Sequence, residues 1–205
     1  MQNSPKGYFQ KILAMDCETS GMSFEDVDPT VEQATGKSYQ SVSWGFVVAD
    51  AATFKPLEEL YLEIKWNGVS EWSAKAESIH GLSKEYLNDN GITEEEAVIH
   101  IYDLFSRHWG PDSLIKTLGH NIASYDLYFL KALLRKFGVN YKFGNRHVDM
   151  NGIGLVCWQT YTSDQLFEAV GLLDRNKHNA LEDAKMSLES ARRTRILFDK
   201  VLKEI

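Results

Sequence analysis

Acidic residues gather in the stretch MDCETSG, which follows a short apolar run. On a strand, Asp16 and Glu18 lie two residues apart and point to the same side. Neighbouring carboxylates repel each other at neutral pH unless a cation lies between them. The spacing therefore fits a metal site, and the simpler alternative is a polar strand end that leads into a Ser-Gly turn.

Two further stretches carry chemistry-bearing residues of the same kind. In GHNIASYD, Asp126 falls in the first turn of an expected helix, where a carboxylate also interacts favourably with the helix dipole. In HNALED, Asp183 lies beside the apolar residues of another expected helix and needs a partner there. His178 precedes that helix and can reach the same place, although a solvated helix start would also explain this segment.

In chain order the three stretches read Asp-x-Glu, Asn-x3-Tyr-Asp and His-x-Ala-x2-Asp. This ordered set resembles the DEDD superfamily of 3′–5′ exonucleases, in its His-containing (DEDDh, DnaQ-like) branch. The segment IHGLS (79–83) is similar to the one that the family carries between its first two motifs, and the resemblance spans about residues 11–190. Asn179 occupies the position where the sister branch has a Tyr. The matched residues are Asp16, Glu18, Asn121, Tyr125, Asp126, His178, Ala180 and Asp183.

The resemblance implies a metal-dependent phosphodiesterase whose four carboxylates converge at one edge of a sheet. Cleavage needs a nucleophile at neutral pH and a sink for charge on the leaving oxygen, and two Mg²⁺ or Mn²⁺ ions about 3.5–4 Å apart supply both. Hard cations prefer oxygen ligands. We expect Asp16 to bridge both ions, Glu18 and Asp183 to complete the ion that activates water, and Asp126 to help hold the other. His178 would act as general base, since imidazole has an unperturbed pKa of about 6.5; a solvent-exposed loop His is the alternative.

Substrate contacts also follow from the resemblance. The backbone around Thr19 and Ser20 would meet the terminal nucleotide, Leu82 would wedge against a base, and Asn121 would touch the sugar-phosphate. Six further side chains could border the site, each with a structural role as the alternative: His80, His120, Arg175, Lys177, Trp66 and Trp72.

The hydrophobic pattern predicts the elements that would position these residues. Alternating apolar residues indicate strands, and spacings of three and four indicate helices. Thr93 and Glu96 form a capping box that begins one helix, and a turn at Lys55-Pro56 would join two strands as a hairpin. Strands are expected over 11–15, 41–49, 59–65, 114–119 and 147–150, and helices over 93–108, 123–137, 150–170 and 180–203.

This order predicts an α/β fold. We expect an RNase H-like mixed sheet of about five strands, with an antiparallel hairpin region plus parallel strands, flanked by helices. The chain reads as one DnaQ-like exonuclease domain over 1–205, with residues 1–10 expected to be flexible. The polar segment 22–40 is a long loop, and it is longer than is usual in the family, which leaves the substrate preference open.

Composition sets broad limits. The net charge of −7 argues against nonspecific tracking on nucleic acid, which needs a basic face, but a metal-binding carboxylate site adds negative charge by itself. No apolar run is long enough for a membrane span, and the first residues do not resemble a signal peptide. The two cysteines, Cys17 and Cys157, fit neither a metal-binding spacing nor a disulfide framework, so a reducing cytoplasm is expected.

We therefore predict a 3′–5′ exonuclease that releases nucleoside monophosphates from single-stranded 3′ ends, with DNA favoured over RNA. The alternatives are an exoribonuclease or oligoribonuclease, a proofreading subunit with a polymerase partner, and an inactive nucleic-acid-binding domain. No membrane partner is expected. A homodimer stays open, because some relatives pair but no surface of this sequence indicates it.

Overall fold

The computed structural model describes residues 10–21, 39–110, 112–172 and 178–204. The predictions for Arg175 and Lys177, for the first nine residues and for most of the 22–40 loop lie outside these ranges. Among the helices that the described ranges contain, none combines the length and the apolar character that crossing a bilayer requires.

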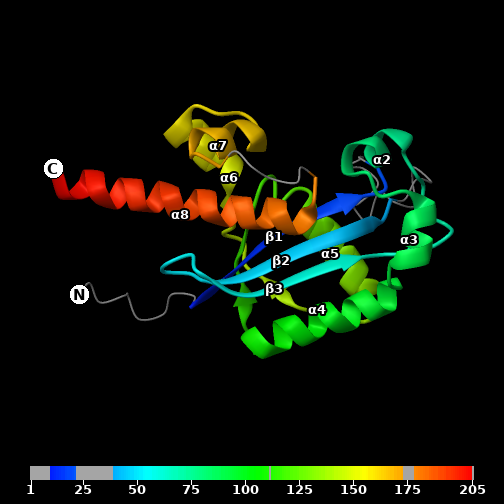
Figure 1. The fold of residues 1–205 in the computed structure, drawn as a ribbon. Helices are drawn as coiled ribbons and strands as arrows, with labels where there is room; N and C mark the ends of the chain where they lie inside the picture. The colour runs from blue at the N-terminus through cyan, green and yellow to red at the C-terminus, as the bar shows by residue number, and fades with distance from the viewer. Residues whose placement is uncertain (1–9, 22–38, 111, 173–177, 205) are drawn as a thin grey trace.

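A five-stranded mixed sheet forms the centre of the molecule, as predicted (Figure 1). The long first strand lies in the middle, with an antiparallel hairpin on one side and two short parallel strands on the other. In spatial order the strands are β3 (Pro56–Glu63), β2 (Ser41–Asp50), β1 (Lys11–Thr19), β5 (Thr117–Gly119) and β7 (Val148–Asp149). The predicted strand 114–119 is divided, because β4 (Leu114–Ile115) pairs with β6 (Lys142–Phe143) in a separate small sheet.

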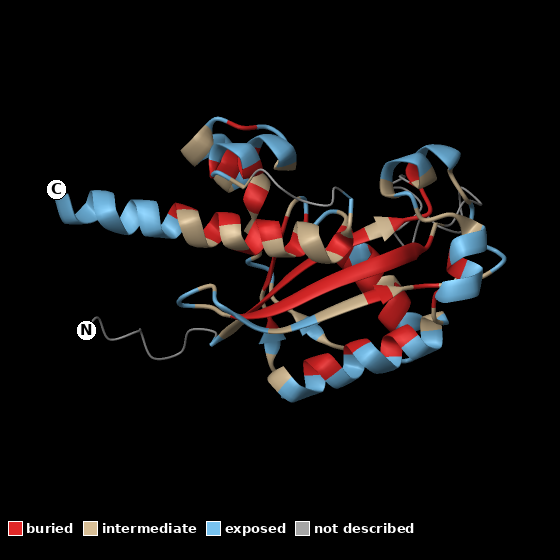
Figure 2. Cartoon of the chain, viewed as in Figure 1, coloured by how far each residue is buried: buried red, intermediate tan, exposed pale blue. Residues whose placement is uncertain are grey.

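Helices cover both faces of the sheet. On one face α4 (Glu94–His108) and α5 (Asp126–Lys136) enclose a core that contains Trp44 and Phe46 of β2. On the other face α8 (Ala180–Glu204), α6 (Met150–Ile153) and α7 (Ser163–Ala169) pack against Val47 and Ala49 of the same strand. Figure 2 shows β2 buried along almost its whole length, because alternate side chains enter different cores.

The second half of the chain departs from the predicted continuous helix over 150–170. After α6 the chain forms a π-helix, η1 (Gly154–Trp158), which ends at Gln159 in the left-handed region with φ of 55°. A β-carbon on Gly154 would lie 2.7 Å from Thr160 Oγ1, so the returning chain passes close to this helix. The break lets α7 turn back toward the sheet, which the apolar spacing alone does not reveal.

Two short helices between β3 and α4 were not predicted. They are α2 (Ala74–His80) and α3 (Lys84–Asn90), and they begin at Ser73 and Ser83, whose side chains accept backbone N–H groups of the first turn. Gly81 ends α2 in the left-handed conformation with φ of 74°. The serine caps and the glycine were the available signals, but each helix has too few residues to show a period.

Candidate active site

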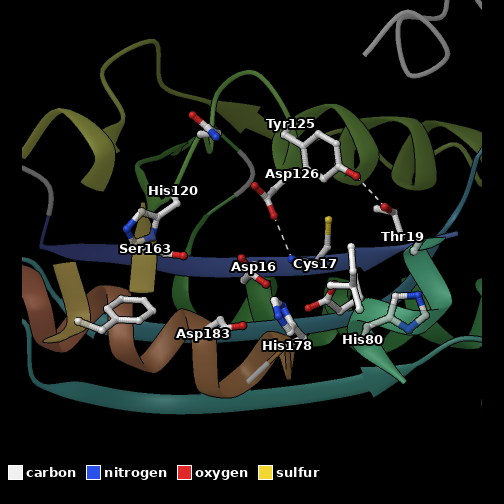
Figure 3. Close-up of a pocket in the computed structure, with 15 residues that line it drawn as sticks. Asp16, Cys17, Thr19, His80, His120, Tyr125, Asp126, Ser163, His178 and Asp183 are labelled. Carbon is white, nitrogen blue, oxygen red and sulfur yellow. Dashed lines mark hydrogen bonds between the residues drawn. The ribbon is translucent and has the colours of Figure 1, made fainter. Parts of the chain in front are cut away.

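A cleft of about 340 Å³ opens where β1 ends and where α5 and α8 begin. All five residues predicted to be catalytic line it: Asp16, Glu18, Asp126, His178 and Asp183. They come from the first strand, from the helix that follows the parallel strand β5, and from the last helix and its preceding loop. Figure 3 shows that the labelled side chains among them point into one space, with Asp16 between Asp126 and Asp183.

The end of β1 supplies two carboxylates and fixes a third. Asp16 and Glu18 are half-buried on the cleft side. The intervening Cys17 is buried in the core, and its backbone N–H donates to Asp126 Oδ1 at 2.9 Å. Burial raises the pKa of the Cys17 thiol well above its ordinary value, and the neighbouring carboxylates add to this effect. The thiol is therefore held in its protonated form at neutral pH.

Asp126 is the most deeply buried acid of the cleft, with 3% of its surface exposed. Burial raises the pKa of its carboxyl to about 7, against the effect of the Cys17 amide, and the charge of Asp149 raises it further. A carboxyl in this position needs a nearby cation to stay fully ionised at neutral pH. The first residue of α5 is thus held in a place where a bound metal ion would compensate its burial.

The segment HNALED positions the last two catalytic candidates. Asn179 caps α8, since its side chain accepts the Glu182 N–H at 3.1 Å and its carbonyl accepts the Asp183 N–H at 2.9 Å. His178 precedes the cap in the left-handed region, with φ of 59°. The helix starts directly against the sheet, because a β-carbon on Gly45 would lie 2.2 Å from the Ala180 backbone.

This close approach matters because Gly45 is the register partner of Asp16. The first turn of α8 therefore lies over the β1 residue that carries the first carboxylate, and Asp183 is brought into the same cleft. A larger residue at position 45 would hold the helix away from the sheet. The acidic start of α8, which a solvated helix end would also explain, is placed by this contact at the edge of the cleft.

Three groups lie close enough to share one metal ion. The ligand atoms of Glu18, His178 and Asp183 are all within 4.8 Å of one another, and among the described residues they are the group of three with this property. His178 is exposed, whereas the two carboxylates are half-buried. Two carboxylates and an imidazole suit divalent cations such as Mn²⁺ or Zn²⁺, and the further carboxylates of Asp16 and Asp126 in the same cleft suit the harder Mg²⁺.

Two histidines border the cleft, as their place in the sequence suggested. His120 lies against α7 and α8, with its Nδ1 3.0 Å from Ser187 Oγ and its ring edge-on to Phe167 at 5.4 Å. His80 lies on the opposite wall, at the end of α2. Sequence reasoning missed Ser163 and Phe167 of α7, which also line the cleft. Nothing in their spacing indicates this, because the turn at η1 brings them there.

The predicted substrate contacts at the end of β1 have different surroundings. Thr19 lines the cleft, and its Oγ1 lies 2.6 Å from the Tyr125 hydroxyl. Ser20 is fully buried and does not line the cleft; its hydroxyl donates to the Glu71 carbonyl at 2.8 Å and accepts the Gln40 N–H at 3.0 Å. The side chain of Ser20 thus ties β1 to the neighbouring loop and strand. Its backbone is also bonded within the protein, because its N–H donates to the Gln40 carbonyl at 2.9 Å and its carbonyl accepts the Ser73 N–H at 2.7 Å.

Of the other two predicted substrate contacts, Asn121 lines the cleft and Leu82 does not. Asn121 lines the cleft with φ of 50°, and its side-chain oxygen accepts a hydrogen bond from Asn151 at 2.6 Å. Leu82 is half-buried and is not one of the residues that line the cleft.

Trp66 and Trp72 both lie within cation–π distance of the Lys84 ammonium, at 3.9 and 5.3 Å from the ring centroids.

Comparisons with known proteins give a structural likeness without a sequence match. No family model matches the chain, and no curated protein matches it in sequence. Among solved structures, a zinc-ion-bound complex of E. coli exonuclease I with single-stranded DNA has a TM-score of 0.72 at 16% identity; the likeness covers 95% of this chain and 43% of that one. The chain thus spans less than half the length of E. coli exonuclease I.

Two other structures are similar over more of their length. The nuclease domain of 3′hExo, a DEDDh family member bound to rAMP, has a TM-score of 0.67 at 16% identity, with 94% of each chain covered. A 3′-exonuclease described by its 3′-end specific recognition of histone mRNA stem-loop has a TM-score of 0.69 at 16% identity, covering 97% of this chain and 67% of that one. The chain therefore has the RNase H-like fold of the DEDDh 3′–5′ exonucleases.

Proposed function

We propose that this chain is a metal-dependent 3′–5′ exonuclease that hydrolyses phosphodiester bonds at single-stranded 3′ ends and releases nucleoside 5′-monophosphates. One observation carries the proposal: acidic and histidine side chains from three distant parts of the sequence meet in one cleft, and the ligand atoms of Glu18, His178 and Asp183 lie within 4.8 Å of one another. The likeness of the fold to DEDDh nucleases supports it.

Four carboxylates are proposed to hold two Mg²⁺ or Mn²⁺ ions: Asp16, Glu18, Asp126 and Asp183. When bound, such ions lower the pKa of water to yield a nucleophile and compensate the charge on the leaving oxygen. The donor set fits, since all four residues line one cleft and the burial of Asp126 would be compensated by a cation. The hydrogen bond from the Cys17 amide orients the Asp126 carboxylate before any ion arrives.

His178 is proposed as the general base. Its exposed imidazole lies beside Glu18 and Asp183, and imidazole can accept a proton near neutral pH. The left-handed backbone at this position is uncommon for a residue other than glycine and is often found at functional sites. It places the ring before the first turn of α8, where the ring meets the two carboxylates.

DNA is retained as the favoured substrate, and RNA is the second candidate. The structural neighbours point both ways, because one was solved with single-stranded DNA and another with rAMP. A protein distinguishes the two by whether it accepts the 2′-hydroxyl. The neutral wall residues of the cleft, Thr19, Asn121 and Ser163, supply polar groups that could meet the sugar.

Matched DNA and RNA oligonucleotides test the proposal directly. Each strand is labelled at its 5′ or its 3′ end and incubated with Mg²⁺, Mn²⁺ or EDTA. We expect the 3′ label to leave first as a mononucleotide, the 5′-labelled strand to shorten stepwise, and EDTA to stop both. Internal cuts, release from the 5′ end, or no cleavage of either strand with any metal would contradict the proposed activity.

A further inference from the structure

His120 lies at the end of the cleft opposite to His80, outside the set of catalytic candidates (Figure 3). It directly follows β5, and its imidazole meets α8: the Nδ1 atom lies 3.0 Å from the Oγ atom of Ser187, at hydrogen-bonding distance. Ser187 is buried, with 3% of its surface exposed, so water has little access to its hydroxyl. The hydrogen bond joins two segments that are 67 residues apart in the sequence.

The backbone next to His120 is fixed by the central sheet. A β-carbon on Gly119, the last residue of β5, would lie 2.7 Å from the Met15 carbonyl oxygen, so β5 and β1 approach each other more closely than a side chain allows. Met15 directly precedes Asp16. The ring of His120 also has a neighbour on α7, because it meets Phe167 edge-on with ring centroids 5.4 Å apart. His120 therefore reaches α8 from a closely packed point of the sheet.

The two partners of this hydrogen bond belong to the segments that carry two cleft carboxylates. Ser187 lies one helical turn after Asp183 on the same face of α8. On the other side, Asp126 begins α5, six residues after His120. Figure 3 shows the carboxylates of these two segments on either side of Asp16. A change in the separation of β5 and α8 would therefore change the distance between them.

We propose that His120 is a positioning residue: its hydrogen bond with Ser187 sets the separation between the end of β5 and α8, and thereby holds the cleft carboxylates of α5 and α8 at the spacing that binds metal. The inference rests on the proposed metal-dependent activity of the cleft. His120 acts through Ser187 and touches neither substrate nor metal in this scheme. Removal of a group that orients metal ligands costs about tenfold to a hundredfold in metal affinity or activity.

Two buried serines of α8 provide a matched pair of variants. Ser187→Ala removes the hydroxyl that meets His120, whereas Ser190→Ala removes a hydroxyl with no hydrogen-bond partner among the residues that the structure describes. Calorimetry on the metal-free protein measures Mn²⁺ binding, and cleavage of a single-stranded oligonucleotide gives kcat and KM. We expect Ser187→Ala to weaken Mn²⁺ binding by about tenfold and to lower kcat similarly, with KM nearly constant. Ser190→Ala should match the wild type in all three quantities.

Two variants of His120 separate the hydrogen bond from the ring. In His120→Asn the side-chain amide can replace Nδ1 as the partner of Ser187, whereas His120→Phe keeps a ring against Phe167 but loses the hydrogen bond. We expect His120→Phe to be impaired as strongly as Ser187→Ala, and His120→Asn to stay near the wild type. The double variant His120→Phe/Ser187→Ala should be no worse than either single variant, because both changes remove the same bond.

Thermal denaturation without metal shows whether each variant is folded, and the two His120 variants give the answer if Ser187→Ala does not fold. Equal Mn²⁺ affinity and kcat in Ser187→Ala and Ser190→Ala would overturn the inference, as would equal impairment of His120→Asn and His120→Phe. Losses that multiply in the double variant would mean that the two groups act separately, and a loss confined to KM would mean that His120 contacts the substrate; either result contradicts the inference. Failure of the proposed function looks different: the wild-type protein itself would neither bind Mn²⁺ nor cleave any strand.

Discussion

The two ends of α8 share the same helical spacing of apolar residues but differ in packing and exposure. At the start, Ala180 lies against the Gly45 backbone and Asp183 faces the cleft. At the end, the apolar side chains of Leu197, Phe198 and Leu202 are 45%, 48% and 67% exposed. Figures 1 and 2 show this end projecting beyond the sheet with exposed residues on it.

The contacts of the helix explain the difference. Among the residues that the structure describes, Arg195 makes the last hydrogen bond between α8 and the sheet hairpin: it donates to the Ala52 carbonyl at 2.9 Å and lies 5.2 Å from the centre of the Phe54 ring. The apolar residues Leu197, Phe198 and Leu202 follow Arg195 on a part of α8 that projects beyond the sheet. Catalytic geometry requires side chains that are held to within fractions of an ångström, so the packed end of α8 can support a site.

The largest effect is expected from removing a charge at the packed end. Asp183→Asn should reduce cleavage by at least about a hundredfold, because a metal site that loses a carboxylate no longer holds its ion in place. Asp199→Asn, a matched change at the exposed end of the same helix, should leave the rate unchanged. Single-turnover assays of both variants measure this, and similar rates for the two would contradict the contrast between the two ends.

His178 precedes the packed end and is expected to have the next largest effect. His178→Ala should slow turnover by about a hundredfold, the usual scale for a lost general base. His100→Ala, at an exposed position of α4, is the control. Rates measured between about pH 6 and 9 check the prediction; if His178→Ala cleaves at the wild-type rate across this range, the assignment of the base is wrong.

Substitution of Gly45 tests whether its close contact with the Ala180 backbone is needed to place the start of α8 at the cleft. A β-carbon there would collide with the Ala180 backbone at 2.2 Å, so Gly45→Ala should push α8 from the sheet and cost about 1–3 kcal/mol of stability. Activity should fall by about tenfold or more through the misplaced Asp183. Gly152→Ala is the control, since a β-carbon at that position would meet nothing within 4 Å. Calorimetric unfolding and cleavage assays that show no difference between the two variants would refute the role of the contact.

The smallest effect concerns stability without metal. Burial raises the pKa of Asp126 from its ordinary value of 3.8 to about 7, so the folded state holds the proton more tightly than the unfolded state. Asp126 therefore contributes a loss of stability to the metal-free protein as pH rises from about 4 to 7. Asp126→Asn removes this loss, and its gain in Tm should be larger at pH 8 than at pH 5 in EDTA. The exposed Asp199→Asn should show no such difference, and an equal gain at both pH values would contradict the prediction.

Much of the site could be predicted from the sequence because each of its three parts is a short segment with a recognisable local pattern. Asp16 and Glu18 share a strand face, and the helix predicted over 180–203 includes the start of α8. The long strands β1 and β2 and the capping box of α4 also follow from local pattern. Local periodicity and caps act within a few residues, so they can be recognised without knowledge of the fold.

Other features depend on contacts between distant segments. The division of strand 114–119, the break at η1 and the entry of Ser163 and Phe167 into the cleft all depend on which chain packs beside them. The same holds for Ser20, whose hydroxyl is occupied by Glu71 and Gln40 rather than left for substrate. The spacing of residues along the chain does not indicate these contacts between distant segments.

The amino-acid sequence alone determined the residue types of the site and the elements that carry them, since side-chain chemistry and local propensity are properties of short segments. Only the tertiary structure decided that Glu18, His178 and Asp183 lie within 4.8 Å of one another, and which end of α8 is packed. The reason is physical. The distance between groups more than a hundred residues apart is set by how the sheet and helices pack, and here by the absence of a side chain at Gly45.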